Sequence, residues 1–243
     1  MTEIIAHRGG AILWPENSLE AFRGAIAAGV DAVECDVHHS ADREAMVMHD
    51  PTLDRTSNGH GPLGEKSAKE LASLRLIGAG GEGVPRLFEL LDIVAAGSGG
   101  IQIEVKADWR GRLDLPLLHK VLAELDRTGM RARTEIIVFE AEIAAAAVAA
   151  GGLRNVAWLF SPPMIRHIGL EGILATARRT GIRMVETHES VMDAALLEAL
   201  RGAGLRVGAW GANHAPSIGR MLGLGLDAIA TDDPVLALSL RGR

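Results

Sequence analysis

Glu34-Cys35-Asp36-Val37-His38 places two carboxylates and a histidine at the point where a run of β-branched residues stops. The same arrangement occurs at His7-Arg8-Gly9-Gly10, near the start of the chain, and at His49-Asp50. Polar side chains at strand ends are typical of parallel α/β proteins, whose active sites lie at the carboxyl ends of the strands. These three strings therefore predict both the class of fold and the place where its chemistry occurs.

Outward from these strings, short apolar runs alternate with longer amphipathic ones, which is the pattern of a parallel sheet with covering helices. Several amphipathic stretches end in glycine directly before an apolar run, as at Gly29, Gly129, Gly151 and Gly181. We predict strands near residues 3–7, 30–36, 45–48, 101–105, 135–139, 155–160, 183–186, 205–210 and 226–230. We predict helices near residues 17–28, 67–76, 86–96, 115–128, 141–150, 163–180, 190–202, 214–223 and 234–240.

The chain has 243 residues, and a parallel barrel with eight strands and eight helices takes about 250. We therefore predict one domain over residues 1–243, an α/β fold that is a single TIM (β/α)8 barrel. Nine strands are one too many, so residues 45–48 form either a hairpin partner of residues 30–37 or a barrel strand, with another assignment wrong. Residues 51–84 break the alternation with Pro, Gly, Asn and Ser clusters. They are expected to form a small insertion after the second strand, over one end of the barrel.

The composition excludes several classes of protein. The net charge of −6 disfavours nucleic acid as a partner, and 48% hydrophobic with 23% charged residues is ordinary for a globular protein. No apolar run reaches the roughly 20 residues of a transmembrane segment, and the residues before His7 are too few for a signal peptide. Cys35 is the one cysteine, so an intramolecular disulfide is ruled out. A cytoplasmic location is expected.

Two pairs of charged residues converge on the predicted barrel mouth. Side chains two apart on a strand share a face, which pairs Glu34 with Asp36 and Glu104 with Lys106. Three carboxylates repel one another unless protons or a cation offset their charge. Oxygen ligands without Cys/His spacing indicate a single divalent cation, Mg²⁺ or Ca²⁺, rather than zinc. Cys35, which points the other way, is predicted to be a buried packing residue.

Two histidines flank this carboxylate cluster. His7 ends the first strand beside Arg8, and His49 ends the third apolar segment beside Asp50. A lone histidine at a strand end is more often structural, but two with an adjacent guanidinium fit a phosphodiester. One imidazole would take a proton from the attacking oxygen and the other would give one to the leaving oxygen. The cation, Arg8 and Lys106 would stabilise the phosphoryl charge.

At this point the sequence resembles the glycerophosphodiester phosphodiesterase family. The matching strings occur in order along almost the whole chain: His7-Arg8-Gly9, Pro15-Glu16-Asn17-Ser18-Leu19-Glu20-Ala21-Phe22, Glu34-x-Asp36-Val37, His49-Asp50-x-x-Leu53-x-Arg55-Thr56-x-x-Gly59-x-Gly61, Glu104-Val105-Lys106, Trp210-x-x-Asn213 and Asp227-x-Ile229-x-Thr231-Asp232-x-Pro234.

The resemblance implies an enzyme, a phosphoric diester hydrolase that releases sn-glycerol 3-phosphate and an alcohol from small soluble glycerophosphodiesters. It also implies roles for these residues. His7 and His49 would be the catalytic acid/base pair, and the metal ligands would be Glu34, Asp36 and Glu104. Phosphate would contact Arg8 and Lys106, and the glycerol 2-hydroxyl would attack phosphorus through a cyclic intermediate. Trp210 is assigned to the substrate, although a place in the plain core fits its position equally well.

Two alternative functions and two residue assignments remain open at this stage. A lysophospholipase D-type lipid phosphodiesterase would use the same site, and a non-catalytic binding barrel would have lost one of its key residues. Asn17, with Glu20 three residues later, is interpreted as a helix N-cap rather than a ligand contact. Glu186 and His188 share a strand-end face, where they either border the substrate or form a salt bridge at the barrel rim.

Overall fold

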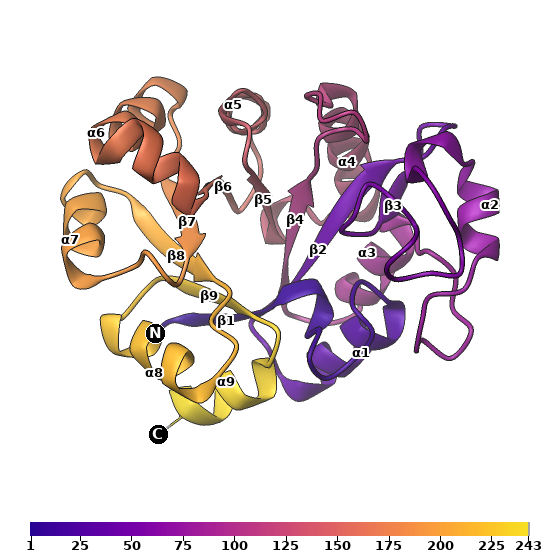
Figure 1. Cartoon of the computed structure of the whole chain (residues 1–243), viewed down its shortest axis with the longest axis horizontal. Helices are drawn as coiled ribbons and strands as arrows, with labels where there is room; N and C mark the ends of the chain where they lie inside the picture. Colours follow the sequence, from indigo (N-terminus) through magenta and orange to yellow (C-terminus); the bar gives the residue numbers. More distant parts are fainter. Residues whose placement is uncertain (243) are drawn as a thin grey trace.

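Eight parallel strands close into a barrel in the computed structural model, which describes residues 1–242 (Figure 1). The first strand pairs with both the second and the last, which closes the sheet on itself. Around the barrel the strands follow one another as β1 (Glu3–Ala6), β2 (Ala32–His39), β4 (Gly100–Val105), β5 (Thr134–Val138), β6 (Asn155–Phe160), β7 (Met184–His188), β8 (Arg206–Trp210) and β9 (Ala228–Thr231). The predicted TIM barrel is confirmed.

Helices surround the strands in Figure 1, where they form an outer ring except for α2, which stands apart with the insertion. Their bounds are α1 (Leu19–Ala28), α2 (Ala68–Ser73), α3 (Leu87–Ala95), α4 (Leu115–Thr128), α5 (Ala141–Ala150), α6 (Pro162–Thr180), α7 (Ala194–Gly202), α8 (Ala215–Leu224) and α9 (Pro234–Arg241). None of the helices among residues 1–242 is long and apolar enough to cross a membrane.

Alternation along β2 explains how apolar and acidic residues share one strand. Val33, Cys35 and Val37 are buried in the large hydrophobic cluster that includes residues of the outer helices. The intervening side chains, Glu34 and Asp36, consequently point to the barrel interior. Cys35 is buried, as predicted, and burial raises the pKa of its thiol.

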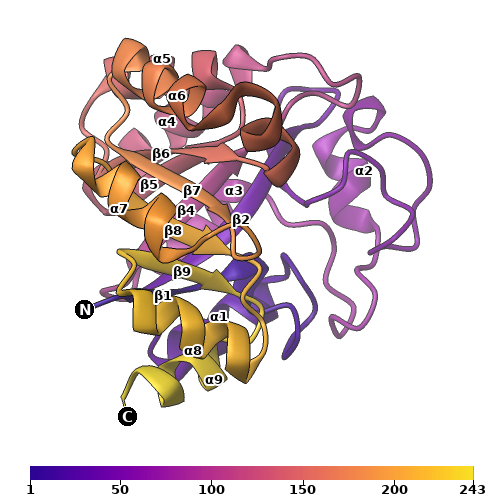
Figure 2. The ribbon, with the colours of Figure 1, turned by 60° about the vertical axis from the view of Figure 1, so that its left-hand side comes forward.

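Besides the eight barrel strands there is one more, β3 (Ala45–Val47), which is not part of the barrel wall. It pairs antiparallel with the end of β2, where Val37 faces Val47. Of the two alternatives for residues 45–48, the hairpin partner is therefore correct. The hairpin leads into the insertion, which stands to one side of the barrel in Figure 2.

The insertion, residues 51–84, has a small core of its own. Leu53, Leu63 and Leu71 are fully buried there with Met46 and Met48 of the preceding hairpin. Its helix α2 begins with a capping box, in which Ser67 and Glu70 satisfy each other's backbone N–H groups. This local core makes the insertion an ordered element beside the barrel mouth.

The predicted elements are all present, with bounds that differ by up to four residues. Strand β2 ends at His39 rather than near residue 36, and helix α2 ends at Ser73 rather than near residue 76. Helix α7 begins at Ala194 rather than near residue 190, because Asp193 accepts a hydrogen bond from the Leu196 N–H and caps it. Helix α1 begins at Leu19 and is capped by Ser18, not by Asn17. Residue 243 of the predicted domain lies outside the described residues.

Candidate active site

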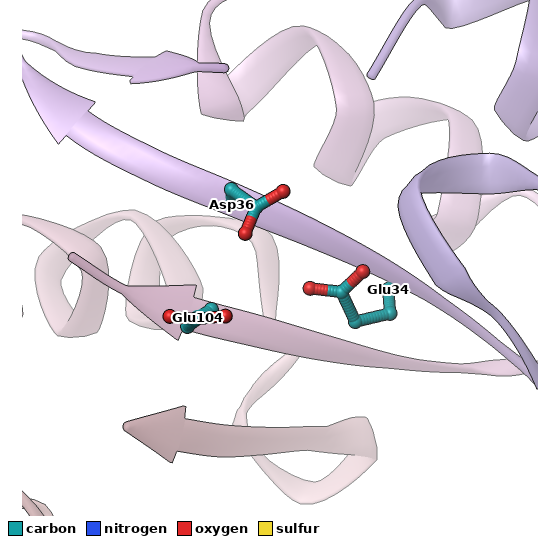
Figure 3. A group of neighbouring side chains, drawn as sticks. All are labelled: Glu34, Asp36 and Glu104. Carbon is teal, nitrogen blue, oxygen red and sulfur yellow. The ribbon is translucent and has the colours of Figure 1, made fainter. Parts of the chain in front are cut away.

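Three buried carboxylates meet inside the barrel mouth (Figure 3). Glu34 and Asp36 project from β2, and Glu104 projects from the adjacent β4, where it is the register partner of Asp36. One oxygen from each of the three lies within 4.8 Å of the others. The structure therefore brings together the three predicted metal ligands.

The cluster has the charge and the spare lone pairs that a cation requires. Oε1 of Glu34 is buried and has no hydrogen-bond partner among residues 1–242. Burial, together with the charge of Asp36, raises the pKa of Glu34 to about 8. Lys106 offsets part of the repulsion between the carboxylates, since its Nζ lies 2.7 Å from Glu104 Oε1 and 2.9 Å from Asp36 Oδ1. Hard oxygen ligands in this geometry fit a divalent ion such as Mg²⁺ or Ca²⁺.

His7 and Arg8 are positioned by a tight turn that ends β1. Arg8 has a positive φ of 53°, which directs its backbone N–H to Glu34 Oε2 at 2.8 Å. The next residue, Gly9, packs so closely on α1 that a Cβ there would lie 2.7 Å from Ala21 Cβ. As a result the Arg8 guanidinium lies beside the acids, with Nε 3.6 Å from Asp36 Oδ2.

The imidazole of His7 is held by an acid from the other end of the chain. Its Nδ1 lies 2.6 Å from Oδ1 of Asp232, and its Nε2 lies 4.0 Å from Glu34 Oε2. Burial lowers the pKa of His7, but the hydrogen bond to Asp232 and the charge of Glu34 outweigh it, so the pKa is raised. Asn213 in turn donates to the other Asp232 oxygen at 2.6 Å.

His49 has an equivalent partner next to it in the chain. Its Nδ1 lies 2.7 Å from Asp50 Oδ1, and Arg55 of the insertion donates to both Asp50 oxygens, at 2.6 and 2.9 Å. Arg55 also donates to both Glu16 oxygens, at 2.7 and 2.8 Å. Each of the two histidines thus has one ring nitrogen bound to a carboxylate and the other available for a substrate.

Asn17 corrects one interpretation of the sequence. It has a φ of 56°, and its Nδ2 donates to Asp36 Oδ2 at 2.8 Å. The cap of α1 is Ser18, whose hydroxyl accepts from the Ala21 N–H. Asn17 therefore supports the carboxylate of Asp36, a predicted metal ligand, instead of starting the helix, and asparagine tolerates the left-handed conformation that this requires.

A pocket of about 110 Å³ joins these groups in one cavity. One half is polar and contains the predicted histidines, Arg8, Lys106, Glu34 and Glu104. The opposite half is mostly apolar and is lined by Ile137, Phe139, Leu159, Trp210 and Ala230. Trp210 thus lies in the pocket wall, with its indole nitrogen lacking a hydrogen-bond partner among residues 1–242. Every predicted site residue except Asp36, which lies behind Lys106, lines this pocket.

Glu186 is the one acid on the apolar half. It accepts a hydrogen bond from Nε2 of Gln102 at 2.8 Å, and the same nitrogen donates to Glu135 at 2.5 Å. Burial, with the negative charge of Glu135, raises the pKa of Glu186 well above its usual value. His188, predicted as its companion, instead packs edge-on against Trp210, with ring centroids 4.6 Å apart.

Several supporting residues were missed by the sequence analysis. Asp232 and Asn213 lie in strings that matched the family, Thr231-Asp232-x-Pro234 and Trp210-x-x-Asn213, and that match was the available signal. Gln102 and Glu135 carry no local signal, because only the barrel closure brings them to Glu186.

Comparisons with known proteins agree with this geometry. A family model described as the glycerophosphoryl diester phosphodiesterase family matches residues 7–236. A glycerophosphodiester phosphodiesterase from Caldanaerobacter subterraneus subsp. tengcongensis is 28% identical over 245 residues, which cover 98% of this chain and 97% of that protein.

Two solved structures have the same fold. A putative glycerophosphoryl diester phosphodiesterase from Agrobacterium tumefaciens superposes with a TM-score of 0.96 at 28% identity, over 100% of this chain and 98% of that one. A phosphodiesterase from Oleispira antarctica, in complex with the product sn-glycerol 3-phosphate, superposes with a TM-score of 0.87 at 23% identity, over 100% and 98%. The family match spans nearly the whole chain, and we conclude that the protein belongs to the glycerophosphoryl diester phosphodiesterase family and is an enzyme of the class that gives the family its name.

Proposed function

We propose that the enzyme hydrolyses small glycerophosphodiesters to sn-glycerol 3-phosphate and an alcohol, using one divalent cation and two histidines. The observation that carries this proposal is one pocket lined by two carboxylate-bound histidines, two acids of the cluster, Arg8 and Lys106, with the third acid, Asp36, paired to Lys106. The product complex of the Oleispira antarctica phosphodiesterase, which shares the fold, supports the same product here.

Glu34, Asp36 and Glu104 would hold the cation, either Mg²⁺ or Ca²⁺. When bound, it would supply Lewis-acid stabilisation of the charge that develops on the phosphoryl oxygens. Arg8 and Lys106 line the same pocket and would bind the phosphate oxygens. Lys106 is well placed for this task because it already bridges Asp36 and Glu104.

The histidines would move the protons. With Nδ1 of each ring held by Asp232 or Asp50, Nε2 is the nitrogen that exchanges a proton with the substrate. One histidine takes the proton of the glycerol 2-hydroxyl as its oxygen bonds to phosphorus. The other gives a proton to the departing alcohol oxygen as its bond to phosphorus breaks. Water then opens the cyclic phosphate with the two roles exchanged.

The test is the release of sn-glycerol 3-phosphate from the diesters of choline, ethanolamine, glycerol and inositol. We expect activity on at least one diester, loss of activity with a chelator, and recovery on adding Mg²⁺ or Ca²⁺. The metal that restores more activity at equal free concentration identifies the cofactor. If none of the four diesters is cleaved with either metal present, the proposed function is refuted.

The lysophospholipase D reading requires an apolar surface at the pocket mouth. Leu53, Leu63 and Leu71 of the insertion are instead buried in its own core, and Ile77 is its one exposed large apolar side chain among the described residues. This arrangement favours small polar diesters. The non-catalytic alternative is disfavoured because both histidines and all three acids are present in one site, where Asp36 pairs with Lys106 of the pocket wall.

A further inference from the structure

Glu186 is a buried acid on the wall of the pocket that faces the metal-binding cluster. It belongs to β7, which lies four strands from β2 in both directions around the barrel. Its neighbours in the pocket wall, Leu159 and Trp210, are apolar, and Glu186 itself is 2% exposed. A buried carboxyl on such a wall destabilises the fold unless it is well partnered. Its presence therefore points to a function.

The structure holds Glu186 in a defined position. Gln102 on β4 donates to its Oε1 and reaches across the interior at the depth of Glu34, the register partner of Gln102. Space for the side chain comes from Gly208 on β8, directly opposite in register. A Cβ at residue 208 would lie 2.9 Å from Glu186 Cγ, so a larger residue would displace the acid.

One oxygen of this carboxyl is free for a ligand. Gln102 donates to Oε1, the Glu135 carboxyl also contacts Glu186, and no side-chain or backbone donor among residues 1–242 reaches Oε2. Glu135 is the neighbouring acid in the same network, but it does not line the pocket. Glu186 thus presents a polar atom to the pocket, and Glu135 does not.

The part of the substrate that reaches this wall follows from the shape of the pocket. All glycerophosphodiesters share the glycerol phosphate half and differ in the alcohol. A small, fixed pocket of about 110 Å³ suits the constant half, whereas a variable alcohol requires the open side. With phosphate at Arg8 and Lys106 on the polar half, the glycerol arm would extend toward the apolar half, where Glu186 is the one acid of the lining.

We propose that Glu186 binds the terminal hydroxyl of the glycerol arm and makes the enzyme selective for substrates in which this hydroxyl is free. The inference rests on the proposed function and adds to it a residue that determines substrate specificity. A hydroxyl both donates and accepts, so it satisfies this oxygen whichever protonation state the carboxyl has. An acyl group on that hydroxyl oxygen removes the donor and leaves Oε2 of Glu186 without a partner, which disfavours lysophospholipids.

The test compares two 4-nitrophenyl phosphodiesters, one of glycerol at its 3-position and one of 1,2-propanediol at its 1-position. Both keep the attacking 2-hydroxyl, and only the glycerol ester has the terminal hydroxyl. The wild-type enzyme is expected to prefer the glycerol ester by about 10- to 100-fold in kcat/KM, the value of a hydrogen bond to a buried carboxyl. Release of 4-nitrophenolate measures both reactions.

Three variants, with a fourth as the control, locate the source of this preference. Glu186→Leu removes the polar group, and Gly208→Ala displaces it; both should bring the ratio of the two kcat/KM values close to one. Glu186→Gln keeps a donor and an acceptor and should retain most of the ratio. Glu135→Leu disturbs the same buried network without facing the pocket, and should retain the wild-type ratio.

Each outcome separates the inference from the proposed function. If the wild type cleaves neither ester, the proposed function fails. If it cleaves both equally well, only the assignment of Glu186 fails, whether or not any variant folds. A ratio that falls as far in Glu135→Leu as in Glu186→Leu would make Glu186 a structural residue and overturn the proposal.

Discussion

Nδ1 of His7 lies 2.6 Å from Oδ1 of Asp232, although 225 residues separate the two along the chain. The carboxylate keeps the proton of the imidazole on Nδ1 and directs Nε2 into the pocket. Asn213 fixes the carboxylate by donating to its second oxygen. In the proposed mechanism Asp232 is therefore a positioning residue, and its contribution can be measured separately from that of the histidine.

Asp232→Asn is expected to lower kcat on the order of 10²- to 10⁴-fold, because an amide can leave the ring in the wrong tautomer. Steady-state kinetics on the glycerol ester checks this value, with KM changing much less. The matched control is Asp233→Asn. Asp233 accepts from the Leu236 N–H to cap α9, and asparagine caps equally well, so this variant should keep its activity. Equal activity in both variants would exclude a role for Asp232.

His7→Ala and His49→Ala are each expected to reduce turnover on the order of 10²- to 10⁴-fold, as for the loss of a proton-transfer group. His60→Ala is the control, since His60 is exposed in the insertion and contacts Asp54. Thermal unfolding verifies that the variants fold. Near-full activity in either of the first two variants would remove that histidine from the mechanism.

Glu34→Gln separates the stability of the site from its function. Burial beside Asp36 raises the pKa of Glu34 to about 8, so ionisation of this carboxyl destabilises the metal-free protein at higher pH. The amide variant should unfold at a higher temperature than the wild type without metal at pH 9. It should also lose the rise in unfolding temperature that Mg²⁺ or Ca²⁺ gives the wild type. A variant that still gains this rise would show that Glu34 is not a ligand.

Asn17 offers a test of the support around Asp36. Asn17→Ala loses the hydrogen bond to the buried carboxylate and strains a residue with positive φ, whereas Asn17→Gly loses only the hydrogen bond. Glycine should therefore be the more stable of the two by about 1 kcal/mol in urea unfolding. If the alanine variant is equally stable, backbone strain at this position is negligible.

The buried acids predict how stability depends on pH. Glu186 has its pKa raised by burial and by Glu135, so the folded state binds a proton that the unfolded state loses near pH 4.5. The stability from this proton is fully present below pH 4.5 and is lost as pH rises toward the folded pKa. Glu186→Gln should therefore gain free energy of unfolding relative to the wild type as the pH rises above 4.5. Urea unfolding at several pH values measures the difference in free energy of unfolding between the variant and the wild type. A difference that does not change with pH would contradict the raised pKa of Glu186.

The sequence predicted what depends on local periodicity. Glu34 and Asp36 alternate with core residues on β2, so their face followed from the strand assignment alone. The glycines after the helices marked the strand starts, and the strings at strand ends marked the pocket. The family resemblance then assigned a role to each of these residues.

What the sequence did not predict depends on contacts between distant segments. Asn17 has the sequence signature of a cap, but the carboxylate of Asp36 holds its side chain and leaves the cap to Ser18. Asp232 reaches His7 only because β9 pairs with β1. For Glu186 the sequence left two alternatives open, a salt bridge at the rim and a contact with the substrate. Its position in the barrel depends on Gly208 and Gln102, which are distant in the sequence.

The pairing of the first barrel strand with the last determines when, during synthesis of the chain, the site becomes complete. His7 precedes Asp232 by 225 residues, so synthesis delivers β1 long before β9, and β1 has no partner on one edge until β9 arrives. A nascent chain that has folded as far as β8 carries both histidines and all three acids, yet the ring of His7 has no carboxylate to hold it. The proposed acid/base pair is therefore complete only when β9 has closed the barrel, and a chain without β9 has both histidines but lacks the carboxylate that positions one of them.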